Sequence, residues 1–211
     1  SPMIFLPASS QKVLWDDAGK NIIGELAREL DLKIALNKIM LHREDVEPAA
    51  YRPKLDKNLE MLNTDPVQNF LRQYADVNVC FFSADEILPK NAEAMLLAHA
   101  EVQKVLPEGV IPFPYLNSSA HGLLPYLPVF VGDFYPIKRE GYSGRNPWSV
   151  YREFSGLVKM AGSTPVWFMP QAFGYRQHTY ALATAGEMRL MLNLAVAAGV
   201  RGIVFHGFAN G

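Results

Sequence analysis

The chain has 211 residues, 49% hydrophobic and 19% charged, and this composition predicts one folded domain rather than a disordered segment. Its 20 basic and 21 acidic residues give a formal net charge of −1, which argues against nucleic acid as the main partner, because phosphate binding needs a basic face. The single cysteine, Cys80, excludes an intrachain disulfide framework, and no apolar run reaches the about 18 residues of a membrane span.

Short apolar runs alternate with helical patterns along the chain. We expect strands at residues 3–7, 32–36, 78–83, 110–113, 126–131, 165–169 and 202–205. Helical periodicity predicts helices at residues 16–30, 54–62, 65–74, 93–105, 147–160 and 184–198, the last ended by Gly199. Strands that alternate with helices indicate βαβ units and a parallel sheet, so the predicted fold class is α/β.

The polar residues at the strand ends favour a closed (β/α)8 barrel over an open sheet. An open nucleotide-binding sheet should carry a glycine-rich first turn, and the sequence contains neither GxGxxG nor GxxxxGK[ST]. A barrel places its active site at the carboxyl ends of its strands, where this sequence has Asp85, Glu86, Asn117, Asp133, Gln171 and His206.

Asp85 and Glu86 directly follow an apolar strand and are the first candidate site. One carboxyl group could act as a general acid with a raised pKa while the other stays charged. The alternative is a structural role as the N-cap of the helix that follows.

Two further strand ends carry candidate side chains. Asp133 could be a second acid and Tyr135 a hydrogen-bond donor to substrate, although Asp133 could instead bond its own turn beside Gly132. Trp167 and Gln171 suit sugar binding, because rings stack on pyranoses and amides bond hydroxyls, although core packing is the alternative for Trp167. We expect these four side chains to line one pocket with the acid pair.

His206 is a lone histidine at a strand end, a position that is more often structural than catalytic. The five histidines show no HxH or HxxxH spacing, so no metal site is predicted, and the missing GxSxG motif argues against an α/β-hydrolase serine. No cofactor is expected.

Four segments together resemble the second half of a glycoside-hydrolase-type TIM barrel: 82–86, 132–137, 165–174 and 184–205. The resemblance implies that the acid pair follows the fourth strand, that Asp-x-Tyr-Pro follows the sixth, and that the Trp…Gln segment forms the seventh. The helix before the eighth strand then begins near Glu187. The implied activity is hydrolysis of a glycosidic bond in an oligo- or polysaccharide, and a secreted or periplasmic location is favoured by the resemblance alone.

The adjacent Asp-Glu pair is similar to that of the β-N-acetylhexosaminidases that use substrate assistance. This resemblance implies Glu86 as acid/base, Asp85 as the partner of a 2-acetamido group, and Tyr135 as a donor to its carbonyl. Gln171 stands where commoner retaining barrels keep a nucleophilic glutamate, which supports substrate assistance or moves the second carboxylate to Asp133.

Two other functions stay open. A catalytically inactive glycan-binding barrel would keep Trp167, Tyr135 and Gln171 as contacts. A phosphate-binding barrel lyase or isomerase is suggested by the glycines at 199–202 and 207–211.

The strand count predicts an incomplete barrel. With the acid pair after the fourth strand, the expected strands are the second to the eighth, and the first strand and last helix are lacking. Both absences fall at one seam, and an open seam leaves unpaired strand edges. We therefore expect residues 1–211 to form a single glycosidase-like domain within a longer protein, completed by flanking sequence or a partner chain; a missed strand within 38–52 is the alternative.

Overall fold

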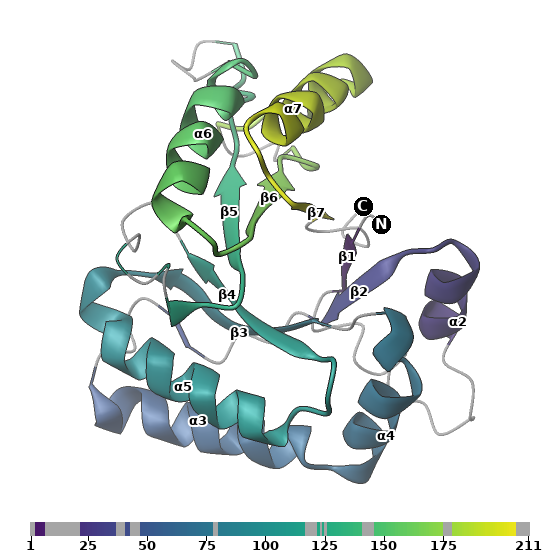
Figure 1. Ribbon diagram of the computed structural model, residues 1–211, viewed down its shortest axis with the longest axis vertical. Coiled ribbons are helices and arrows are strands. Elements are labelled where there is room, and N and C mark those ends of the chain that lie inside the picture. Colours follow the sequence, from purple (N-terminus) through teal and green to yellow (C-terminus); the bar gives the residue numbers. More distant parts are fainter. Residues whose placement is uncertain are drawn as a thin grey trace.

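The computed structural model describes residues 3–6, 22–36, 41–42, 47–77, 80–116, 122, 124, 126–140, 146–174 and 179–205. Within them, seven parallel strands follow one another around a closed ring in chain order (Figure 1). The strands are β1 (Met3–Leu6), β2 (Lys33–Leu36), β3 (Cys80–Ile87), β4 (Ile111–Leu116), β5 (Phe130–Phe134), β6 (Val166–Pro170) and β7 (Gly202–Phe205). The predicted α/β class and parallel sheet are confirmed.

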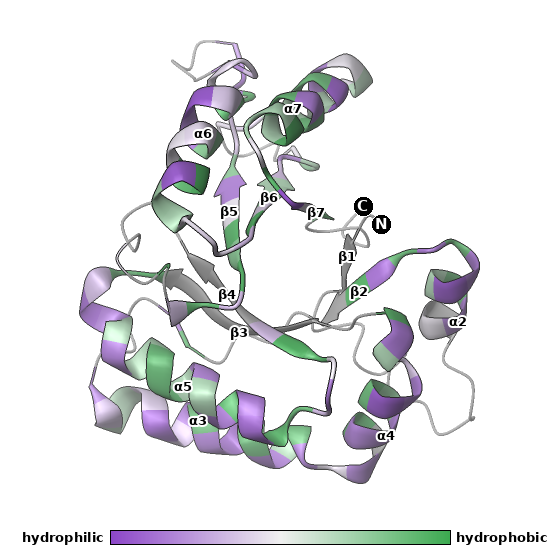
Figure 2. Ribbon diagram, in the orientation of Figure 1, coloured by the Kyte–Doolittle hydropathy of each residue, from purple (hydrophilic) through white to green (hydrophobic). Residues whose placement is uncertain are grey.

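Helices lie around the outside of this ring. They are α2 (Ile22–Glu29), α3 (Pro48–Leu62), α4 (Asp65–Gln73), α5 (Ala92–Val105), α6 (Ser149–Ala161) and α7 (Ala185–Ala197), with the short 3-10 turns η2 (Ala75–Val77) and η3 (Pro89–Asn91). Figure 2 shows hydrophobic and hydrophilic residues alternating around them, as expected for helices with one face on a sheet. No helix among the described residues is long and apolar enough to cross a membrane.

The ring is closed by its first and last strands. Met3 of β1 is registered with Val204 of β7, and Ile4 is registered with Phe205. The expected open seam is therefore wrong, and an incomplete eight-stranded barrel is not confirmed, because the seven described strands pair without a gap. Whether residues 1–211 belong to a longer protein stays a prediction.

The two faces of the strands contribute to two apolar layers. Phe168 of β6 faces outward, and its ring centroid lies 4.6 Å from that of Phe154 in α6. Because successive strand residues point to opposite faces, the alternate residues Val131, Met169 and Val204 lie inside the ring, where all three are buried. Burial on both faces explains why these strands are continuous apolar runs in the sequence.

Several element boundaries differ from the predicted ones. Helix α3 begins at Pro48, six residues before the predicted start, because a proline in the first turn costs no hydrogen bond. Helix α4 begins at Asp65, as predicted, and Thr64 is its N-cap. Helix α7 begins as predicted, with Thr184 and Glu187 in a reciprocal capping box.

Two strand boundaries matter for the site. Strand β3 continues to Ile87, and β5 occupies 130–134 rather than 126–131. The predicted acids Asp85, Glu86 and Asp133 therefore lie within the carboxyl-terminal parts of these strands rather than after them.

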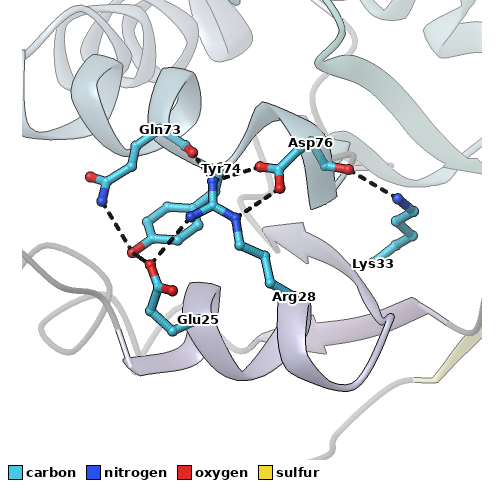
Figure 3. A network of polar contacts seen from close by, with 6 residues as sticks. All are labelled: Glu25, Arg28, Lys33, Gln73, Tyr74 and Asp76. Carbon is cyan, nitrogen blue, oxygen red and sulfur yellow. Dashed lines mark hydrogen bonds and ion pairs between the residues drawn. The ribbon is translucent and has the colours of Figure 1, made fainter.

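A polar network fixes α2 to the end of α4 (Figure 3). The Arg28 guanidinium donates to both carboxylate oxygens of Asp76, at 2.7 and 2.8 Å, and to the backbone carbonyl of Gln73. It also lies 4.7 Å from the ring centroid of the fully buried Tyr74, whose hydroxyl donates to Glu25 at 3.1 Å. Arg28 holds the pKa of Asp76 below its usual value by this hydrogen bonding.

Candidate active site at the carboxyl end of the ring

The acid pair Asp85–Glu86 lies at an irregularity in β3. Ala84 is registered with Pro114 and Ile87 with Leu116, so two residues of β3 stand opposite the single residue Tyr115. Pro114, which borders this irregularity, has no N–H to donate to the ladder. Such bulges are frequent beside active sites, where they change the direction of a side chain.

The helix-cap interpretation of this pair is wrong. The chain stays in β3 through Asp85 and Glu86, and the next helical turn begins only at Pro89. There the side chain of Asn91, whose Oδ1 accepts from the Leu88 N–H at 3.1 Å, satisfies the backbone. The N-cap of this turn is Leu88, so neither Asp85 nor Glu86 occupies the N-cap position.

Asp133 lies on the interior side of β5. Its neighbour Gly132 faces the helices, since a Cβ atom there would meet the side chains of Phe154 and Leu157 at 3.3 and 3.5 Å. Asp133 is therefore on the opposite, interior face, where it is half-buried and registered with Met169. Because β5 runs on to Phe134, the alternative of a turn at Gly132–Asp133 is wrong.

Asp133 and the acid pair lie at a similar level along the ring. Tyr115, opposite the pair, is registered with Val131 of β5. Because barrel strands are tilted, the residue at the same height on a neighbouring strand lies about one position beyond the registered residue. Over the two steps from β3 to β5, the residue at the height of the acid pair is therefore about Asp133 rather than Val131. Figure 2 shows β5 changing from hydrophobic to hydrophilic toward its arrowhead.

Tyr135 follows Asp133 at the mouth of the ring. Its hydroxyl donates to Sδ of Met169 at 3.6 Å, and its ring centroid lies 4.7 Å from that of Phe173 and 5.8 Å from that of Tyr180. Tyr135, Phe173 and Tyr180 are each half-buried and meet edge to face. They form an aromatic cluster at the carboxyl ends of β5 and β6.

Gln171 joins the two loops that carry this cluster. Its Oε1 accepts from the Ile137 N–H at 2.9 Å, and its Nε2 donates to the carbonyls of Ile137 at 2.9 Å and Ala181 at 2.6 Å. The side chain is fully buried. Gln171 therefore holds the two loops together from their buried side. Its side-chain amide is hydrogen-bonded to backbone groups and is not exposed at the surface.

Trp167 lies deeper in the ring than the other predicted contacts. It is registered with Val131 and with Gly202 of β7, and its ring covers Gly202, where a Cβ atom would lie only 2.7 Å from Cδ1. It precedes Met169 by two residues, which places it about 7 Å further from the carboxyl end. Gln171 thus holds the segments that carry Tyr135 and Tyr180, and Trp167 is set apart from this group.

Asn117 and His206 lie outside the described residues. Within the described ranges, no group of three or more His, Cys, Asp or Glu side chains could hold a metal ion.

The structure adds Lys138 and Tyr180, which the sequence did not single out. Lys138 and Tyr180 form an antiparallel bridge, and the ammonium of Lys138 lies 3.5 Å from the ring centroid of Tyr180. The only sequence signal was the basic pair Lys138–Arg139 just after Tyr135. Tyr180 had none, because its bridge to Lys138 joins two segments that are far apart in the sequence.

Comparisons with known proteins give no family for this chain. No protein-family model matches it, and no curated protein matches it. It is similar in structure to the β-glucuronidase from Ruminococcus gnavus in complex with uronic isofagomine, with 9% identity, a TM-score of 0.45, and coverage of 88% of this chain and 36% of that one. It is also similar to the CcCel6A catalytic domain complexed with p-nitrophenyl β-D-cellotrioside, with 12% identity, a TM-score of 0.32, and coverage of 96% and 61%.

The chain thus spans about a third of the first solved structure and about three fifths of the second. Both TM-scores lie below 0.5.

Proposed function

We propose that this chain is a glycoside hydrolase domain that uses carboxylate acid/base catalysis. One observation carries the proposal: acids occur on β3 and β5 of a single closed parallel ring, at its carboxyl end, with only β4 between them. That end is where the parallel strands of a barrel deliver catalytic residues from different parts of the sequence.

The spacing of the strands suits this chemistry. Neighbouring strands are about 4.8 Å apart, so the backbones of β3 and β5 are separated by about 10 Å. Carboxyl groups on β3 and β5 can therefore reach the carboxyl-to-carboxyl distances that glycosidases use. These distances are about 5–5.5 Å in retaining enzymes and about 6.5–9.5 Å in inverting ones. A proton donor and a second carboxylate are the two groups that glycosidic cleavage requires.

The proposed roles follow the chemistry of each group. Glu86 protonates the leaving oxygen, Asp85 orients the substrate, and Asp133 is the second carboxylate if the substrate itself does not supply the nucleophile. The Tyr135 hydroxyl turns from Met169 Sδ, its acceptor in this structure, to donate to a substrate oxygen.

The test uses two sets of aryl glycosides with poor and very good leaving groups. Glu86→Gln should cut turnover of the poor-leaving-group set by at least about a hundredfold and affect the other set much less, because a good leaving group needs little protonation. Glu60→Gln, an exposed glutamate on α3, is the matched control and should change neither rate. Equal, small losses with both sets would refute the assignment of Glu86.

A glycan-binding domain without turnover is the second candidate. It is favoured by the half-buried aromatic cluster of Tyr135, Phe173 and Tyr180, because such rings can stack against sugars. Saturable glycan binding without hydrolysis, weakened by Tyr180→Ala and unchanged by Glu86→Gln, would favour this candidate over the enzyme.

A further inference from the structure

The rim beside the aromatic cluster carries a pair of basic residues. We call residues 135–139 and 179–181 the basic–aromatic rim. Its two segments are joined by the Arg139 N–H to the Thr179 carbonyl at 2.9 Å and by the Ala181 N–H to the Ile137 carbonyl at 3.2 Å. The fully buried Gln171 holds both from beneath, so the rim is a fixed part of the mouth.

Both cations of the rim are fixed beside Tyr180. Lys138 Nζ lies over its ring at 3.5 Å, and Arg139 Nε donates to its backbone carbonyl at 3.3 Å. Both side chains are half-buried. Within the part of the chain that the structure describes, Lys138 contacts the face of this ring and no carboxylate.

The face of an aromatic ring attracts an ammonium group but does not neutralise it as a carboxylate would. Partial burial also reduces screening, so an anion arriving at Lys138 would gain more than at a fully solvated lysine.

The cation of the rim lies close to the candidate acid in the sequence. Asp133 lies inside the ring, and Lys138 stands on the rim, five residues further along the same segment. A substrate with one negative substituent is attracted to Lys138, and this attraction orients it in the mouth.

We infer that the basic–aromatic rim is a subsite for a negatively charged sugar, bound through a carboxylate or sulfate group at Lys138 with the sugar ring against Tyr135, Phe173 or Tyr180. This inference rests on the proposed function, because it names the substrate class of the same site. The substrate is then an acidic glycan rather than a neutral one.

The test measures binding of three probes by titration calorimetry: oligogalacturonides, sulfated galacto-oligosaccharides and neutral galacto-oligosaccharides. The wild-type chain should bind one of the acidic probes at least about tenfold more tightly than the neutral probe, since hydrogen bonds to charged groups are among the stronger ones. The preferred acidic probe distinguishes carboxylate from sulfate, and raising the salt concentration should reduce the preference.

Three variants connect the preference to Lys138. Lys138→Met keeps the apolar stem on Tyr180 but loses the charge, and should abolish the preference for the acidic probe. Lys138→Arg keeps the charge over the ring and should retain most of it. Lys159→Met removes an exposed lysine on α6 and should have no effect.

The outcomes separate the two proposals. Equal binding of acidic and neutral probes, or a preference that survives Lys138→Met, overturns the subsite while leaving glycan hydrolysis intact. Absence of binding to all three probes, together with absence of turnover of the aryl glycosides, overturns the subsite and the proposed function together.

Discussion

Replacing Gln171 by leucine tests whether this side chain holds the mouth of the ring together. Leucine has a similar size but cannot bond to backbone. The Ile137 N–H then loses the Oε1 acceptor at 2.9 Å, and the Ala181 carbonyl loses the Nε2 donor at 2.6 Å. The Ile137 carbonyl keeps the Ala181 N–H at 3.2 Å, so two backbone groups are left without these partners.

The expected loss of stability follows from these two groups. An unsatisfied buried polar group costs about 1–3 kcal/mol, and two of them lower the free energy of unfolding by about 2–4 kcal/mol, since the new leucine recovers part through apolar burial. For a domain of this size, each kcal/mol corresponds to about 3 °C in Tm, so the midpoint should fall by about 6–12 °C.

Thermal denaturation followed by circular dichroism measures this shift. Gln103→Leu, at an exposed position on α5, is the matched control and should leave the midpoint within about 2 °C. Gln171→Glu should be at least as damaging at neutral pH, because a carboxylate would face the carbonyls of Ile137 and Ala181. A Gln171→Leu midpoint within about 2 °C of wild type would refute the claim that these hydrogen bonds hold the loops.

Three other changes give direct checks of the packing. Burial lowers the pKa of His99, whose Nδ1 has no hydrogen-bond partner among the described residues. The unfolded chain therefore binds more protons than the folded chain below about pH 6.5, and the free energy of unfolding measured in urea should fall as the pH drops from about 7 to 5. His99→Leu should reduce this dependence on pH. Arg28→Lys keeps the charge but loses the two-pronged contact with Asp76, so amide exchange in α2 should quicken with little change in the global midpoint; unchanged protection of α2 would contradict the network. Gly202→Ala forces the ring of Trp167 to move and should cost about 1–3 kcal/mol with an altered tryptophan emission; an unchanged spectrum and midpoint would show that the ring is not held there.

Much of the architecture was readable from local patterns. All seven described strands lie at or close to predicted apolar runs, because strands buried on both faces lack the polar alternation of a surface strand. Helix α7 was equally clear, since Thr184 and Glu187 cap it locally and Gly199, at φ 95°, follows its end. The order of the elements and the acids near the ends of β3 and β5 follow from such short-range signals.

Long-range pairing decided the rest. Closure of the ring depends on Met3 meeting Val204, about two hundred residues apart, and no local pattern reports that contact. The register of β3 against β4, which places two acids opposite Tyr115, depends on both strands together. Likewise, Gln171 and Lys138 obtained their partners only when separate loops met at the mouth, because a hydrogen bond or a cation–π contact is specified by position in space and not by spacing along the chain.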